Sequence, residues 1–152
     1  MGALLPKKFK KLIKEKKYHM IFFIFSIMSS KVITVNNLTH YLQLLEKEKR
    51  VVVVDFSAHW CGPCKKLAPI LDQLSTKYCN LLLILKVDVD QEDKLDQEEK
   101  ISPLFSVHSL PTMVFIKDCQ FQQGDDFRIE GLNVNKLMTV LKTLTGGQVQ
   151  QM

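Results

Sequence analysis

From Lys31 onward, the hydrophobic positions follow two alternating patterns, one typical of buried strands and one of amphipathic helices. Three short apolar runs rich in β-branched residues predict strands at residues 32–35, 51–56 and 81–87. Between them, apolar side chains recur at helical spacing: Leu38, Tyr41, Leu42 and Leu45, then Leu67, Ile70, Leu71 and Leu74. This alternation favours parallel strands joined by crossover helices. The nearly continuous run at 51–56 is typical of a central strand covered on both faces.

The second half of the chain departs from this alternation. It opens with an acidic stretch at residues 91–100, which holds five acids and two lysines. Two further strands are predicted at residues 113–116 and 127–130, paired with each other as a hairpin. A last amphipathic helix is marked by Val134, Leu137, Met138 and Leu141.

The pattern also predicts where the domain begins and ends. Gly146 and Gly147 end the last helix, and we expect the tail at residues 148–152 to fray. The regular pattern therefore spans residues 31–147. Its order predicts an α/β domain with a mixed central β-sheet flanked by helices on both faces.

Composition agrees with one globular domain. The chain has 152 residues, of which 46% are apolar and 24% are charged, and this excludes a disordered or collagen-like protein. Four cysteines are too few for a small fold held together by disulfides. No apolar run is long enough to form a full transmembrane helix.

The net charge of +5 belongs to the amino-terminal end of the chain. Residues 1–19 contain seven lysines and one acid, Glu15, whereas the remaining 133 residues carry a net charge of −1. The domain itself therefore gives no reason to expect nucleic acid as a partner.

Residues 1–30 form an extension with three possible interpretations. The lysine-rich stretch runs into an apolar segment at residues 20–28, and this order resembles a secretory signal. Alternatively, a lysine-rich helix with Phe9, Leu12 and Ile13 on one face would contact a membrane surface. The third interpretation is an extension without a role.

The sharpest motif is the segment Trp60-Cys61-Gly62-Pro63-Cys64-Lys65, which follows a predicted buried strand and opens a helix. Two cysteines three positions apart on a first helical turn can bring their sulfurs within bonding distance. The amino terminus of the helix stabilises the thiolate of the first cysteine, and a thiolate is the species that attacks a disulfide.

Two features near the motif allow more than one interpretation. Asp55 interrupts a valine run, and burial there would raise its pKa into the range of a neutral-pH proton acceptor; alternatively, it lies solvated at a strand end. The two cysteines could instead bind zinc, but Cys79 and Cys119 are single and separated, whereas a structural zinc site needs a second pair of ligands. We therefore predict no metal.

The motif and its surroundings resemble the active-site segment of thioredoxins. The resemblance extends from about residue 31 to residue 144, and it includes Val54-Asp55-Phe56 before the motif. Residues 86–90 (KVDVD) and 110–112 (LPT) belong to it as well. It implies the thioredoxin fold.

The resemblance also implies roles for individual residues. Cys61 would be the nucleophile and Cys64 the resolving thiol, joined as a redox disulfide in the oxidised protein. Asp55 would relay a proton to or from Cys64, with Lys86 as its charge partner, although Lys86 could also be a plain surface lysine. The substrate-binding surface would consist of Trp60, Gly62, Pro63, Leu110, Pro111 in the cis form, and Gly131.

The chain departs from the family pattern in two places. The segment between Asp90 and Pro111 is longer, which predicts a larger surface loop or an added helical turn. Cys119 stands at the predicted hairpin turn, where the family commonly has glycine, and residues 120–126 are extra. Both changes bear on partner choice rather than on the cysteine chemistry.

Taken with the resemblance, the motif predicts a thiol–disulfide oxidoreductase that reduces protein disulfides and contributes to cell redox homeostasis. It would bind no cofactor, and its electrons would come indirectly from NADPH through a partner that resembles thioredoxin reductase. We expect a cytoplasmic location, with weak membrane-surface contact through residues 1–28 as a possibility. Two alternatives stay open: a redox-inactive peptide-binding module, and a disulfide oxidase or isomerase of the secretory pathway.

Overall fold

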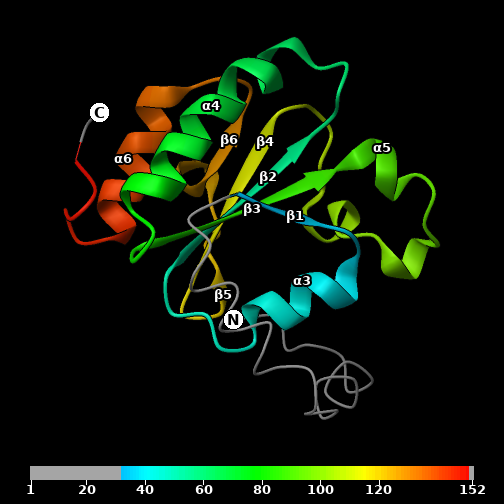
Figure 1. Ribbon diagram of the computed structural model, residues 1–152, viewed down its shortest axis with the longest axis horizontal. Coiled ribbons are helices and arrows are strands. Elements are labelled where there is room, and N and C mark those ends of the chain that lie inside the picture. The colour runs from blue at the N-terminus through cyan, green and yellow to red at the C-terminus, as the bar shows by residue number, and fades with distance from the viewer. Residues whose placement is uncertain (1–31, 151–152) are drawn as a thin grey trace.

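The computed structural model describes residues 32–150, and the six strands of that part of the chain form one mixed sheet (Figure 1). The strands are β1 (Ile33–Val35), β2 (Val51–Ser57), β3 (Leu82–Asp88), β4 (Thr112–Lys117), β5 (Gln120–Phe121) and β6 (Arg128–Glu130). Their order is β1-β3-β2-β4-β5, and β6 also pairs with β4. The first three strands of this order run parallel, and β4 is antiparallel to β2. The interpretations of residues 1–30 lie outside the described residues.

Helices cover both faces of the sheet, as predicted. The helices are α3 (Leu38–Leu45), α4 (Gly62–Lys77), the short α5 (Val89–Glu92) and α6 (Val134–Leu144). Helices α4 and α6 lie together on one face, and α3 lies on the other (Figure 1). On the α4 face, Leu71 and Leu141 pack in one cluster with Val53. On the α3 face, Tyr41 packs in a second cluster with Phe56.

Strand β2 is buried along its whole length. Because successive side chains of a strand point to opposite faces, Val53 and Asp55 share the face covered by α4, whereas Phe56 faces α3. One edge of β2 pairs with β3 and the other pairs with β4, so neither edge of β2 is free. The predicted central strand is therefore confirmed, and four residues connect its end to the amino terminus of α4.

The longer segment between β3 and β4 folds into short helical turns, as its length predicted. After α5 come two 3₁₀ turns, Gln97–Glu99 and Ser102–Phe105. The carboxylate of Glu92, which is buried, accepts hydrogen bonds from the backbone N–H groups of Ile101 and Ser102. The centre of the Phe105 ring lies 6.1 Å from the centre of the Tyr41 ring and 5.7 Å from that of Phe56. These contacts fix the segment on the α3 side of the domain.

The predicted hairpin is wrong in its detail. Strand β4 turns back through Asp118 and Cys119, both with positive φ, into the two-residue strand β5. Strand β6 begins only at Arg128, after a 3₁₀ turn that ends at Phe127. It pairs with the first part of β4, Thr112 to Val114, whereas β5 pairs with the end of β4. The extra residues after the turn therefore split the returning strand into two pieces, although the predicted antiparallel pairing with β4 is confirmed.

The expectation that the carboxyl-terminal tail frays is wrong for residues 148–150. Gly146 and Gly147 have φ values of 62° and 85°, and this turn brings Val149 back onto the core, where it is fully buried. Tyr78 Oη donates a hydrogen bond to the carbonyl of Gln150 at 3.1 Å. The backbone N–H of Val149 also donates to Thr145 Oγ1 at 3.1 Å, so a buried side chain and several hydrogen bonds together hold this end.

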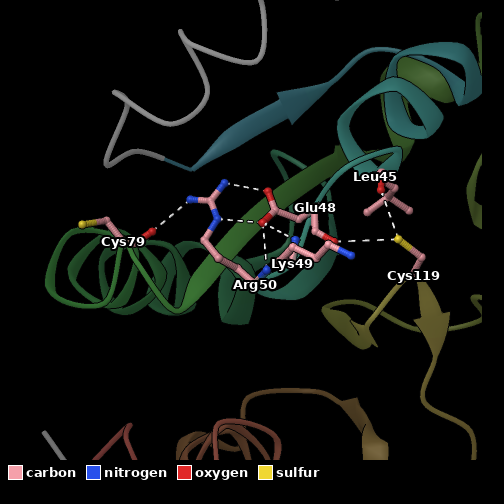
Figure 2. Close-up of polar contacts among 6 residues, drawn as sticks. All are labelled: Leu45, Glu48, Lys49, Arg50, Cys79 and Cys119. Atoms are coloured by element: carbon pink, nitrogen blue, oxygen red, sulfur yellow. Dashed lines mark hydrogen bonds and ion pairs between the residues drawn. The ribbon is translucent and has the colours of Figure 1, made fainter.

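A charged cluster ties the start of β2 to its neighbours, as Figure 2 shows. Arg50 Nη2 lies 2.7 Å from Glu48 Oε2, and Arg50 Nε donates to Glu48 Oε1 at 2.9 Å. The third nitrogen, Nη1, donates to the carbonyl of Cys79 at 2.9 Å. On the other side, the exposed Cys119 Sγ donates to the carbonyl of Leu45 at 3.4 Å. Burial alone would raise the pKa of Glu48, but the hydrogen bonds and charge of Arg50 outweigh it and lower that pKa.

Replacing Arg50 by methionine should lower the free energy of unfolding by about 2 kcal/mol at neutral pH, because Glu48 keeps its charge but loses its main partner. Since the pKa of Glu48 lies below 4.5 in the folded protein, the loss should be complete above pH 4.5 and should fade as the pH drops through the folded value. Denaturant unfolding measures this difference. Lys49→Met, at an exposed neighbouring side chain, is the control and should change stability by less than about 0.5 kcal/mol; equal losses in the two variants would contradict the assignment.

Candidate active site

Cys61 and Cys64 lie at the amino terminus of α4 and are joined by a disulfide. Cys61 is the N-cap residue, and its Sγ accepts a hydrogen bond from the backbone N–H of Cys64 at 3.3 Å. Both cysteines are buried, whereas Gly62 and Pro63 between them are exposed. Proline fits this first turn because the position needs no N–H partner. The chain therefore places a dithiol–disulfide couple at the positive end of a 16-residue helix.

Three other segments converge on this pair of cysteines. Ala58 belongs to the same buried cluster, and Val89 and Leu110 pack against it. The bond between Leu110 and Pro111 is cis, as the family resemblance implied. The loop before β4 and the start of α5 thus both pack against the cysteine pair.

Gly131, which the resemblance implied for the substrate-binding surface, lies beside the cis proline. Its backbone N–H donates a hydrogen bond to the carbonyl of Pro111 at 2.8 Å. Its φ of 80° is in the left-handed region, which glycine adopts at little cost. The neighbouring Leu132 is 40% exposed, so an apolar surface continues past this point. Leu110, Pro111 and Gly131 are therefore brought together at one border of the cysteine pair.

Trp60 is the most exposed large apolar side chain of the described residues, at 63%. Its indole nitrogen Nε1 donates a hydrogen bond to Asp90 Oδ1 at 2.9 Å. The other oxygen of this carboxylate, Oδ2, lies 2.6 Å from Nδ1 of His59. One carboxylate on α5 therefore holds both residues that precede Cys61.

Asp55 is buried on β2 and faces the helix that carries the cysteines. Burial raises its pKa to about 7, and the positive charge of Lys86 opposes this rise. Lys86 is the direct neighbour of Asp55 across β2 and β3, and is only partly exposed. Asp55 is thus buried rather than solvated, and Lys86 is its charged neighbour rather than a lysine on the open surface. Both observations favour the roles that the resemblance implied.

Two polar atoms on this face of β2 are unpaired. Among the described buried side chains, Asp55 Oδ1 and Ser57 Oγ make no hydrogen bond to any described residue, the cysteines included. Asp55 and Ser57 are two positions apart, so their side chains point to the same face of the strand. The structure therefore places an acid of near-neutral pKa and a hydroxyl on the face of β2 that α4 covers. Neither Asp55 Oδ1 nor Ser57 Oγ makes a direct hydrogen bond to a cysteine sulfur.

Sequence reasoning missed Asp90 as a functional residue. The residue belongs to the KVDVD segment, but its contacts with His59 and Trp60 span 31 and 30 positions. A signal was present, because the carboxyl ends of adjacent parallel strands meet at the same edge of a sheet. The residues that follow β2 and β3 could thus have been expected to meet.

The rival interpretation of the cysteines was a metal site. Within residues 32–150, no three histidine, cysteine, aspartate or glutamate residues are grouped so that they could hold a metal ion. Cys79 and Cys119 are not disulfide-bonded, and both lie in the cluster of Figure 2 at the start of β2.

Comparison with known proteins places these features in one family. The sequence model of the family Thioredoxin matches residues 31–143. Thioredoxin Asp f 28 of Aspergillus fumigatus is 37% identical over 115 residues, which cover 76% of this chain and 95% of that protein. Thioredoxin-T of Drosophila melanogaster is 45% identical over 75 residues, which cover 49% of this chain and 44% of that protein. The thioredoxin structure of Fasciola hepatica superposes with a TM-score of 0.63 at 32% identity, covering 74% of this chain and 99% of that one.

The extent of these matches differs between relatives. The chain spans between 44% and 61% of the length of four curated relatives that it matches. The family match, in contrast, covers nearly all of the predicted domain, and the Aspergillus protein is covered almost end to end. The predictions of family and fold are confirmed, and the chain belongs to the thioredoxin family.

Proposed function

We propose that the protein is a thiol–disulfide oxidoreductase that reduces disulfides of other proteins and so contributes to cell redox homeostasis. The observation that carries this proposal is the Cys61–Cys64 disulfide at the amino terminus of α4, above a buried aspartate with a pKa of about 7. Family membership supports it. A redox-inactive peptide-binding module would have no use for an intact cysteine pair.

The reaction begins with the reduced protein. The Cys61 thiolate, stabilised by the helix amino terminus, attacks one sulfur of the substrate disulfide, and the other substrate sulfur leaves as a thiolate. A mixed disulfide now joins Cys61 to the substrate. Asp55 accepts the proton of the Cys64 thiol, whose thiolate then attacks Cys61 and releases the second substrate sulfur. The two substrate thiolates take up the proton that Asp55 accepted and one proton from the solvent. The products are a substrate dithiol and the Cys61–Cys64 disulfide, so two electrons have passed to the substrate.

Substrate docking is assigned to the surface around the cysteines. Trp60, Gly62 and Pro63 lie exposed next to the pair. Leu110 packs against the pair and adjoins Pro111, which binds Gly131, and there the backbone of an extended substrate segment could pair with the chain. Phe and Leu side chains of a substrate would find apolar contacts at Trp60.

The oxidised protein must be reduced again before each new cycle. We assign this step to a partner that resembles thioredoxin reductase and takes its electrons from NADPH, because the chain has no phosphate-binding glycine motif of its own. The protein would therefore carry electrons without a bound cofactor.

A cytoplasmic location is part of this proposal, with residues 1–28 giving weak contact with anionic membrane surfaces. The seven lysines and the apolar stretch at 20–28 support the contact. None of the helices within residues 32–150 is long and apolar enough to cross a membrane. Action as a secretory oxidase or isomerase is the alternative, and only the stretch at 20–28 favours it.

Cys61→Ser should abolish insulin reduction, since the attacking thiolate is lost. Cys64→Ser should instead accumulate a mixed disulfide through Cys61, visible as an added substrate mass in non-reducing mass spectrometry. Cys79→Ser and Cys119→Ser, at cysteines outside the disulfide, are the matched controls and should reduce insulin at the wild-type rate. A Cys61→Ser protein with wild-type activity would refute the assignment.

Asp55→Asn should slow turnover at least tenfold near pH 7, because a general base contributes about 10²-fold or more. The deficit should shrink as the pH rises and Cys64 ionises without help. An identical pH–rate profile in variant and wild type would remove Asp55 from the mechanism.

The same substitution should change the dependence of stability on pH. The pKa of Asp55 is 3.8 in its ordinary state and about 7 in the fold, so the folded protein holds the proton more tightly. Wild-type stability should therefore fall as the pH rises from about 4 to about 7, whereas Asp55→Asn should not show this fall. At pH 8 the variant should be more stable by up to about 4 kcal/mol, as denaturant unfolding of the oxidised protein would show.

Removal of residues 1–27 should leave insulin reduction unchanged, because the predicted domain begins only at Lys31. The full chain should sediment with anionic vesicles, and the shortened chain should remain in solution. Lost activity in the shortened chain would contradict this boundary, and equal sedimentation of the two chains would contradict the membrane contact.

A further inference from the structure

Arg128, on β6, has no part in the mechanism above, although it holds the chain just before the docking surface. Its Nη1 donates a hydrogen bond to the carbonyl of Phe105 at 2.7 Å, and its Nη2 donates to the carbonyl of Ser106 at 2.9 Å. Its Nε donates to Glu130 Oε1 at 2.8 Å, and only 23% of the side chain is exposed. The planar guanidinium thus joins β6 to a segment more than 20 positions away, and Glu130 fixes its orientation.

The backbone corner that Arg128 holds is one that the chain adopts at a cost. Ser106 has a φ of 49°, in the left-handed region that residues other than glycine rarely occupy. The hydrogen bonds that close this corner from the N–H groups of Ser106 and Val107 are long, at 3.4 Å each. The last carbonyls of a helical turn have no partner within the turn, and the carbonyls of Phe105 and Ser106 find theirs in Arg128. The corner therefore depends on a contact from outside its own segment.

The corner leads directly into the docking loop. Three positions later, the carbonyl of Ser109 accepts a hydrogen bond from Thr112 Oγ1 at 2.7 Å, and the Ser109 side chain hydrogen-bonds to Glu130. Glu130 is also the strand partner of Thr112. Leu110 lies between these anchor points and packs against the two cysteines. Arg128 and Glu130 therefore hold the loop both before and after the residue that contacts the active site.

A fixed loop matters for docking because an extended substrate pairs its backbone with the loop's own. If the loop adopts the docking conformation only part of the time, the apparent affinity falls by that fraction. The contacts of Arg128 named above lie on the loop and on β6, whereas Cys61 and Cys64 lie on α4. Loss of Arg128 should therefore weaken docking without slowing disulfide exchange in the docked complex.

We propose that Arg128 is a positioning residue for substrate docking: its guanidinium, oriented by Glu130, holds the corner at residues 105–106 and thereby the loop that presents Leu110 and Pro111. The proposal rests on the proposed function, because it concerns how disulfide substrates reach Cys61. Arg128 acts through the loop and touches neither the reacting sulfurs nor the substrate.

The test follows single turnovers of the pre-reduced full chain with excess insulin. The remaining thiols of the protein are counted by alkylation and mass spectrometry at several insulin concentrations. These data give the half-saturating insulin concentration, which reports docking, and the limiting rate constant, which reports exchange. A second substrate, bis(2-hydroxyethyl) disulfide, is too small to pair with the loop and reports exchange at Cys61 alone. Hydrogen exchange of the backbone amides at residues 106–110 measures the order of the loop directly.

Arg128→Met should raise the half-saturating insulin concentration about fivefold, as expected if the loop is in the docking conformation about a fifth of the time. Its limiting rate constant and its rate with the small disulfide should stay within about twofold of wild type. Amide exchange at residues 106–110 should become faster. Arg128→Lys keeps the charge but loses the planar fork, so its half-saturating concentration should lie between those of Arg128→Met and wild type. If Arg128→Met does not fold, the rise in Arg128→Lys carries the test.

Arg50→Met is the matched control. Arg50 also binds a carboxylate and a distant carbonyl, those of Glu48 and Cys79, but it precedes the start of β2, whereas the cysteines follow its end. The control should lose stability and keep the half-saturating concentration and the loop exchange of wild type.

An equal rise in Arg50→Met and Arg128→Met would overturn the proposal, because general destabilisation would explain both. An unchanged half-saturating concentration in Arg128→Met, or equal slowing with insulin and the small disulfide, would overturn it as well. Failure of the wild type to reduce insulin would instead contradict the proposed function.

Discussion

The complete burial of β2 is the constraint on which the rest of the structure depends. Four consecutive valines, Val51 to Val54, fill both faces of the sheet, and β3 and β4 occupy both edges. Any polar group on this strand is therefore carried into an apolar layer. Asp55 is such a group, and its pKa of about 7 is the direct electrostatic result. The packing that stabilises the fold thus also prepares an acid for proton transfer at neutral pH.

The parallel arrangement of β2 and β3 decides what surrounds the cysteines. Both strands end at the same edge of the sheet, so the loop before α4 meets the start of α5 there (Figure 1). Asp90 uses this proximity to bind Trp60 and His59 with one carboxylate. The residues around Cys61 are therefore positioned from two directions, by the helix that begins there and by a side chain from the next crossover.

The sequence predicts what depends on local pattern and misses what depends on distant contacts. The strands predicted at 32–35, 51–56 and 81–87 agree with β1, β2 and β3 to within one residue at every end, because buried apolar runs leave a clear pattern. Strand β5 leaves none, since it has two exposed residues and exists only through its pairing with β4. Val149 is an isolated apolar residue between two glutamines, and periodicity cannot identify one residue. Cys61, Cys64 and Asp55 could be found from the motif, whereas Asp90 could be found only by combining the motif with the parallel pairing of β2 and β3.

The buried carboxylate of Glu92 has a consequence for how this chain can vary. By binding the amides of Ile101 and Ser102, it closes the intervening residues into a loop whose two ends are fixed to each other. Most of the enclosed side chains are exposed, and the cost of closing a flexible loop grows slowly with its length. Insertions, deletions or a grafted peptide between residues 93 and 100 can therefore be accommodated while α5 and the cysteines keep their positions. The segment is a natural place for the chain to diversify, or to be engineered, without disturbing its chemistry.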